Sequence, residues 1–330
     1  MPRSSGPQPL WLIWLGPLLI ALACLAWFWW GRESLAQKHP PAGGMGGAVA
    51  SAGLDPTGGN PGQSGAQSGV GLAAACRETA DWLARQLGVP CHVIVRVPWV
   101  LGGDLSEGDL DRWHRETVRP AAGALAESYF TVPPHEPITL LLFSNERVYR
   151  ESAWKLLREK DVPVYGGYRR HLRMSMVNLA TGAGAVGHEL THALIDFDFP
   201  EAPEWLIEGL ASLHEEYRIS QDGSRLEGLI NWRLPILQAG MRDGRARTIE
   251  SLTGSDDFHG SREKLNYAQA RYFCLYLQRL GALGRYYREL RAGIKDDPSG
   301  RKSLTAVLGG RSWAEIEADF RRWVMELKPS

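Results

Sequence analysis

Two histidines and a glutamate in one short stretch have the types and spacing that bind a metal ion. The stretch reads His188-Glu189-Leu190-Thr191-His192. On a helix, His188 and His192 face the same way, and Glu189 lies about 100° round the axis from His188. This pattern is typical of two imidazoles that hold zinc beside a carboxylate that accepts a proton from a water. We therefore predict one Zn²⁺ ion, with His188 and His192 as ligands and Glu189 as the general base.

A catalytic zinc needs a third protein ligand besides these histidines, and it must come from a second element. Asp196 continues the same helix face, but it lies about 12 Å along the axis from His188, too far to converge on one ion. Glu208 is the best candidate, because it lies on the next predicted helix, which Pro203 opens at a favourable first-turn position. Glu204 on the same helix is the alternative. Other glutamates nearby (Glu201, Glu215 and Glu216) are read as ordinary solvated side chains.

The predicted second helix has side chains suited to packing close to the first. Trp205, Leu206 and Leu210 are large and apolar, so we expect them to pack inward. Gly209 and Ala211 are small, which predicts a close approach to the histidine helix.

The elements around these helices predict an α+β fold, with a small mixed sheet followed by a helical half. Apolar β-branched runs indicate strands, Gly166 to Tyr168 a turn, and apolar periodicity indicates helices. The expected strands are 92–99, 137–143 and 172–179. The expected helices are 73–87, 106–129, a helix N-capped after Ser144-Asn145 and running to 160, the histidine helix, 203–217, 226–240, 265–280, 282–292 and 312–327.

Two motifs together resemble those of the gluzincins, the thermolysin-like zinc metallopeptidases. The likeness is closer to bacterial peptidase MA-like domain proteins, in which H-E-x-x-H-A-L precedes P-x-W-L-x-E-G-L-A. Residues 188–194 and 203–211 match these motifs, and the likeness extends more loosely over 137–323. The resemblance implies a zincin-like domain, zinc ligation by His188, His192 and Glu208, and Glu189 as the base.

Other groups are candidates for supporting roles. Tyr267 is similar to a recurrent tyrosine of related proteins and is the candidate donor to the oxyanion that forms in peptide hydrolysis; the alternative is a core or capping tyrosine. His214 could donate a proton, or could face the core or solvent. Ser212 could orient an imidazole, or be an ordinary helix serine. The strand at 172–179 could present an edge on which an extended peptide pairs.

The N-terminus predicts a membrane anchor. Residues 10–30 form an uncharged apolar run, about 30 Å long as a helix, with tryptophans near both ends. A cleaved signal peptide or a lipoprotein signal is the alternative. We expect a tail at 1–9, an anchor at 10–30, a flexible Gly/Ala/Ser/Pro linker at 31–71 and the zincin-like domain at 72–330. We expect a single-pass membrane protein whose catalytic domain is extracytoplasmic.

The charge balance and the positions of the cysteines argue against nucleic-acid binding and against a disulfide bond. With 37 basic and 37 acidic side chains, the chain has no charge excess that would indicate nucleic-acid binding. The helix after Cys76 separates it from Cys91, so we expect no disulfide between them. Cys274 is expected to be a packed thiol.

The sequence thus predicts a membrane-anchored zinc metallopeptidase that hydrolyses peptide bonds in peptide or protein substrates. The alternative is a non-catalytic zincin-fold protein that binds a partner or a cell-wall component. Retention of Glu189 favours the enzyme, since a binding protein needs no base. An intramembrane protease is excluded, because the histidines lie far from the apolar run.

Overall fold

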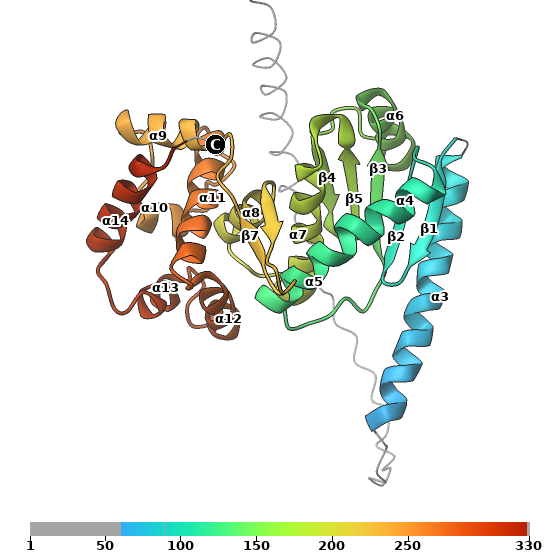
Figure 1. Ribbon diagram of the computed structural model, residues 1–330, viewed down its shortest axis with the longest axis horizontal. Helices are drawn as coiled ribbons and strands as arrows, with labels where there is room; N and C mark the ends of the chain where they lie inside the picture. Colours follow the sequence, from blue (N-terminus) through green and yellow to red (C-terminus); the bar gives the residue numbers. More distant parts are fainter. Residues whose placement is uncertain (1–60, 89, 329–330) are drawn as a thin grey trace, which may run out of the picture.

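The computed structural model describes residues 61–88 and 90–328. In this part of the chain, a five-stranded mixed sheet is followed by a half made mostly of helices (Figure 1). The strand order is β1-β2-β3-β5-β4. The predicted α+β class, with a mixed sheet ahead of a helical half, is confirmed.

The first predicted strand is in fact a hairpin. β1 (His92–Arg96) pairs antiparallel with β2 (Trp99–Gly103), and the chain turns at Val97-Pro98. The prediction of one strand over 92–99 is therefore wrong. Proline has no backbone N–H for the ladder, which makes it a natural end for a strand.

The centre of the sheet is parallel. β3 (Ile138–Phe143) lies between β2 and β5 (Met174–Asn178) and pairs parallel with both. β3 and β5 confirm the strands predicted at 137–143 and 172–179. Every residue of both strands is buried, as expected for strands covered on two faces.

One edge of the sheet is formed by β4 (Gly166–Arg169), which pairs antiparallel with β5. The turn predicted at Gly166 to Tyr168 is therefore wrong, and β5 has no free edge because it lies between β3 and β4. A Cβ on Gly166 would lie 2.6 Å from the Met176 carbonyl oxygen. A glycine is thus needed at position 166 for close pairing between β4 and β5. Glycines, however, give no strand signal in a sequence.

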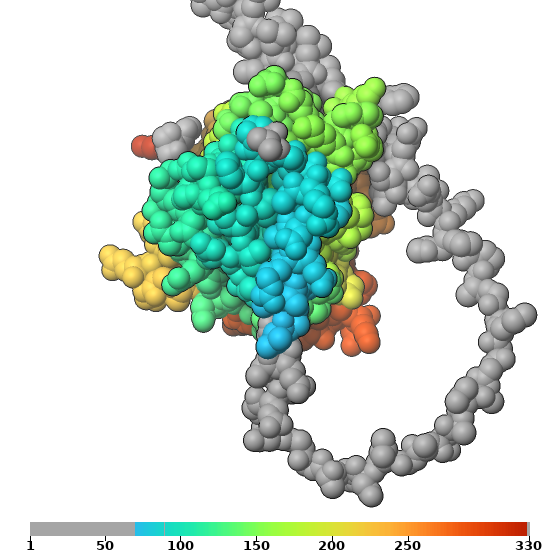
Figure 2. All heavy atoms as spheres, turned by 90° about the vertical axis from the view of Figure 1, so that its right-hand side faces the viewer, coloured from blue at the N-terminus to red at the C-terminus, as the bar shows by residue number. Residues whose placement is uncertain are grey.

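Alternate side chains of the sheet enter two separate cores. Val100, Leu141 and Met176 pack with α3 (Pro61–Leu87) and α6 (Glu146–Leu157) on one face. Leu140 and Val177 pack on the other face with α5 (Arg119–Ser128) and α7 (Gly184–Asp198). Figure 2 shows α3 in blue along the outside of the molecule.

The predicted helix over 106–129 is present in three consecutive segments. They are α4 (Glu107–Trp113), a π-helical turn (His114–Val118) and α5. Ser106 caps its start by accepting a hydrogen bond from Asp109 N. Asn145 likewise caps α6, as predicted, by accepting one from Val148 N.

The helical half is built around α11 (Glu263–Arg279), which contacts α8 (Glu204–Leu213) and α9 (Leu234–Arg242). The remaining helices of this half are α10 (Ile249–Thr253), α12 (Leu283–Gly293), α13 (Arg301–Val307) and α14 (Trp313–Glu326). The helices predicted at 265–280, 282–292 and 312–327 are confirmed, whereas α10 and α13 were not predicted.

A second, two-stranded sheet interrupts the helical half. β6 (Tyr217–Ile219) pairs antiparallel with β7 (Leu226–Gly228). The helix predicted over 226–240 is therefore wrong in its first part, because the apolar run there serves a short strand. The intervening Asp222-Gly223, with φ +75° at Gly223, is a turn signal.

The N-terminal predictions are only partly accessible. The tail at 1–9, the anchor at 10–30 and most of the linker lie outside the described residues. α3 begins at Pro61, so residues 61–71 are helical rather than linker; once a helix is nucleated, each added residue gains a hydrogen bond. Among the described residues, no helix has both the length and the apolar character to cross a membrane. Cys76 and Cys91 are free thiols, and Cys274 is a buried one, as predicted.

Candidate metal centre

The predicted histidine helix, α7, runs between the sheet and α8. After β5 the chain passes through a short 3₁₀ turn to Gly182, whose φ of +110° suits a residue without a Cβ. α7 then places His188 and His192 one turn apart, with their Nε2 atoms 3.0 Å from each other. The two ring nitrogens therefore converge on one point.

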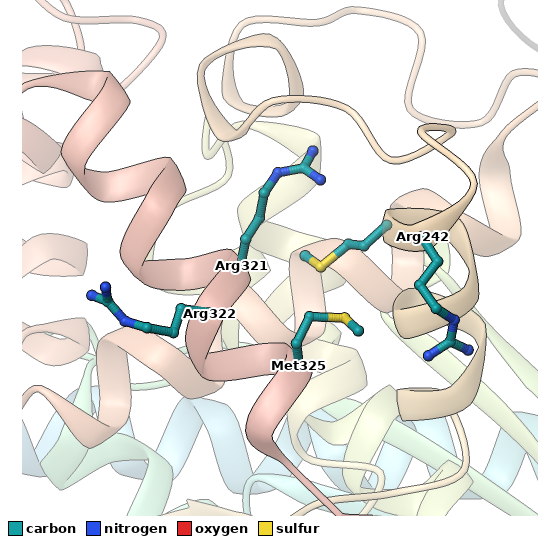
Figure 3. Close-up of a pocket in the computed structure, with 5 residues that line it drawn as sticks. Arg242, Arg321, Arg322 and Met325 are labelled. Carbon is teal, nitrogen blue, oxygen red and sulfur yellow. The ribbon is translucent and has the colours of Figure 1, made fainter.

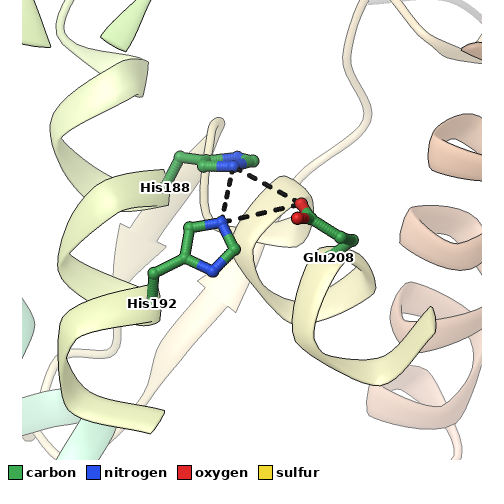
Figure 4. A group of neighbouring side chains, drawn as sticks. All are labelled: His188, His192 and Glu208. Atoms are coloured by element: carbon green, nitrogen blue, oxygen red, sulfur yellow. Dashed lines mark hydrogen bonds and ion pairs between the residues drawn. The ribbon is translucent and has the colours of Figure 1, made fainter. Parts of the chain in front are cut away.

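Glu208 completes the group from α8. Figure 4 shows its side chain directed from α8 toward both imidazoles of α7. Glu208 Oε2 lies 3.7 Å from His188 Nε2 and 3.6 Å from His192 Nε2. The residue is only 8% exposed, and Oε2 accepts no hydrogen bond among the described residues.

These three distances fit a zinc ion. A triangle with sides of 3.0, 3.6 and 3.7 Å has its circumcentre about 2.0 Å from each corner. Zinc binds histidine nitrogen at about 2.0–2.1 Å and carboxylate oxygen at about 2.0–2.2 Å. The three side chains predicted as ligands are therefore brought together with the spacing that one zinc ion requires.

The protonation of His192 and Glu208 also suits a cation. Burial, together with the charge of His188, lowers the pKa of His192 well below its usual value. His192 is therefore neutral, which is the form that binds metal. Burial raises the pKa of Glu208, so its ionised form gains strongly from a neighbouring positive charge.

Glu189 lies on α7 against the edge strand. It is 5% exposed, and its Oε2 has no hydrogen-bond partner among the described residues. Burial raises the pKa of Glu189 to about 7. A Cβ on Gly166 would lie 3.5 Å from Glu189 Oε1, so the start of β4 runs beside this carboxylate. A group with this pKa can both accept and return a proton near neutrality.

Glu204, the alternative ligand, points to a different partner. Its Oε1 lies 2.9 Å from His259 Nε2, and Glu263 Oε1 lies 2.9 Å from His259 Nδ1. Burial opposes charge on His259, but these two carboxylates raise its pKa to about 10. Glu204, Glu208 and His259 have ligand atoms close enough for a metal. Because His259 is already a cation paired with two carboxylates, the group of His188, His192 and Glu208 is the better metal site.

The supporting residues named from the sequence are all buried. Tyr267 is 6% exposed and hydrogen-bonds to the Glu208 carboxylate. Its role as a donor to the oxyanion stays a prediction. His214 lies in the core, with Nδ1 3.1 Å from Thr191 Oγ1, and burial lowers its pKa to about 3. A histidine that stays neutral has no extra proton to donate. Ser212 Oγ bonds neither imidazole in the described part of the chain.

The packing of α8 differs from expectation at one position. Trp205, Leu206 and Leu210 are buried, as predicted. Gly209, however, faces α11, where a Cβ would lie 2.8 Å from Cys274 Sγ. Glycines of α7, at positions 184 and 187, instead lie against the turn that follows α8.

Sequence reasoning missed Glu215. Its Oε1 lies 3.3 Å from His188 Nδ1, on the other side of the ring from Glu208. In the sequence, Glu215 has no feature that separates it from Glu201 or Glu216. Only the turn that follows α8 brings it to the histidine.

Two surface hollows lie on other elements. One, of about 290 Å³, is lined by Met241 and Arg242 of α9 and by Arg321, Arg322 and Met325 of α14 (Figure 3). The labelled arginines point away from one another, so they do not converge on one anion. The other, of about 370 Å³, lies between α3 and the start of β5. Neither contains a residue of the metal group.

Comparison with known proteins adds no assignment. No family model matches this chain, and no curated protein matches it. The resemblance to gluzincins thus rests on the two motifs, and the metal group rests on the geometry above.

Proposed function

We propose that this protein is a membrane-anchored zinc metallopeptidase of the gluzincin type. The observation that carries the proposal is the convergence of His188 Nε2, His192 Nε2 and Glu208 Oε2 about a point some 2.0 Å from each. A buried carboxylate, Glu189, directly follows His188 on the helix that carries both histidines. A binding protein has no need for such a group.

The residues divide the work of peptide hydrolysis. A zinc ion in this group supplies Lewis acidity, which acidifies water and polarises a peptide carbonyl. Glu189 takes the proton from the attacking water, because its pKa of about 7 leaves much of it ionised at neutral pH. Glu189 then gives this proton to the leaving amine.

Tyr267 is our candidate for the donor to the developing oxyanion. Its hydrogen bond to the Glu208 carboxylate places the hydroxyl beside one of the three ligands. In this proposal the hydroxyl turns from the Glu208 carboxylate to the oxyanion, because a phenol has only one proton to donate.

The substrate binds in extended form along β4. β4 is an edge strand, and its first residue, Gly166, lies against Glu189. A peptide that adds to this edge by backbone hydrogen bonds is held beside the base, independently of its side chains. This supports peptides or protein segments as the substrate class.

The location proposed for the enzyme follows from the sequence. Residues 10–30 form the anchor, and the domain described here is held on the extracytoplasmic side.

Glu189→Gln tests the proposed function. The full chain with this change should bind zinc as the wild type does, because Glu189 is not in the ligand group, and should lose at least about 100-fold in the rate of peptide cleavage. Zinc content and cleavage of a peptide library are measured on both proteins, with Glu216→Gln as the control for an exposed glutamate. Equal cleavage by Glu189→Gln would remove the mechanism. A zinc-loaded wild type that cleaves no peptide would support the non-catalytic alternative.

A further inference from the structure

The second nitrogen of His188 has its own carboxylate partner. Nδ1 of His188 lies 3.3 Å from Glu215 Oε1, whereas Nε2 faces Glu208 and His192. Both side chains are largely buried, with exposed fractions of 16% for His188 and 15% for Glu215. Among the described residues, no carboxylate bonds Nδ1 of His192. Of the two imidazoles, only that of His188 therefore has a carboxylate at Nδ1 in the described part of the chain.

The Glu215 carboxylate is itself fixed by donors from the loop before α9. Arg233 donates from Nε to Oε2 at 2.9 Å and from Nη2 to Oε1 at 2.7 Å. Asn231 Nδ2 donates to Oε2 at 3.2 Å. A forked arginine pair of this kind sets the plane of the carboxylate as well as its position.

Two glycines of α7 let Glu215 come this close. A Cβ on Gly184 would lie under 3.0 Å from the Glu215 carbonyl oxygen, and one on Gly187 equally close to that of His214. The turn that carries Glu215 is thus in backbone contact with α7 just before His188. Its position relative to the imidazole is set by main-chain packing, which does not depend on a flexible side chain.

From this geometry we infer that Glu215 is a positioning residue of the metal centre. It accepts the Nδ1 proton of His188, which fixes the tautomer with a free electron pair on Nε2 and fixes the ring toward Glu208. Arg233 and Asn231 keep the carboxylate in place. Partners of this kind also make the ligand more basic, and their loss costs about 10–100-fold in metal affinity. The inference rests on the zinc site of the proposed function but not on peptide cleavage.

The test measures zinc affinity of the full chain by competition with a chromophoric chelator. It compares the wild type with Glu215→Gln, Glu215→Asp and the control Glu216→Gln, since Glu216 is an exposed neighbour. Visible spectra of the cobalt(II)-loaded proteins report ligand geometry, and thermal unfolding of the metal-free proteins reports stability. We expect Glu215→Gln to bind zinc about 10–100-fold more weakly and to shift the cobalt bands. Glu215→Asp should fall between, because it keeps the charge that pairs with Arg233 but is shorter by one methylene.

The outcomes separate this inference from the proposed function. Zinc affinity of Glu215→Gln within about two-fold of the wild type would overturn it, as would an equal loss in Glu216→Gln. An unchanged cobalt spectrum, with weaker binding that only follows a loss of metal-free stability, would show a merely structural role and also overturn it. If Glu215→Gln does not fold, unchanged affinity in Glu215→Asp decides against it. Failure of peptide cleavage with these zinc results intact would overturn only the peptidase.

Discussion

Gly187 of α7 lies against the backbone of His214, so that a Cβ at position 187 would come within 3.0 Å of the His214 carbonyl oxygen. This Cβ would also lie 2.9 Å from Cε1 of Tyr217. Because the first obstacle is main chain, it cannot rotate away. Gly187 directly precedes His188, and the contact therefore sets the distance between the histidine helix and the turn that carries Glu215.

Gly187→Ala should destabilise the protein and weaken zinc binding. Overpacking against backbone costs about 1–3 kcal/mol, more than the gain of up to about 1 kcal/mol from alanine in a helix. Gly123→Ala in α5 is the matched control, because a Cβ there meets nothing within 4 Å. Denaturant unfolding and zinc content check both variants. Equal stability of the two variants would contradict the close packing of α7.

Glu208→Ala should lower zinc affinity by more than about 100-fold, since even partners outside the ligand set account for 10–100-fold. Glu204→Ala should leave zinc content unchanged, because Glu204 bonds to His259. The two changes remove the same group from the same helix and so control for each other. Metal analysis of the purified proteins is the measurement. A larger loss of zinc in Glu204→Ala than in Glu208→Ala would show that Glu204 is the third ligand.

Glu189→Gln should stabilise the metal-free protein at alkaline pH. The folded-state pKa of Glu189 is raised from 4.5 to about 7 by burial. A raised carboxyl pKa contributes stability that is full below pH 4.5 and is lost as pH rises through 7. The loss is on the order of 3 kcal/mol, at about 1.4 kcal/mol for each unit. Unfolding free energies of the metal-free wild type and variant should therefore diverge between pH 5 and pH 8, in favour of the variant. Parallel curves would contradict this.

Asp198→Asn should cost about 3 kcal/mol of stability, because it removes the charge of a buried carboxylate that accepts several hydrogen bonds. Asp198 accepts hydrogen bonds from Thr131 N and Val132 N at 2.7 and 2.8 Å, and its carboxylate lies 3.2 Å from Arg291 Nε. Asp243→Asn is the control, since the Asp243 side chain is 54% exposed in its pair with Arg245 and such pairs are worth little. Thermal unfolding of both variants checks the difference, which should vanish only if Asp198 is solvated.

The sequence was a good guide where a periodic pattern was long. α7, α8, α11 and α14 follow apolar spacing that only a helix explains, and β3 is a short apolar run bounded by prolines and a capping residue. It was a poor guide where pairing is a matter of backbone contact. β4 contains two glycines, and β7 is three residues long, so neither has a local signal that outweighs a turn or a helix.

The sequence by itself determined the chemistry of the candidate site, because H-E-x-x-H on a helix fixes the spacing of His188, Glu189 and His192 through helix geometry alone. Only the tertiary structure decided which distant groups join them. It brought Glu208 rather than Glu204 to the imidazoles and placed Glu215 behind His188. The physical reason is that these contacts depend on how closely whole helices and turns pack. The glycines that permit the packing lie in α7, whereas Glu208 and Glu215 come from α8 and from the turn after it.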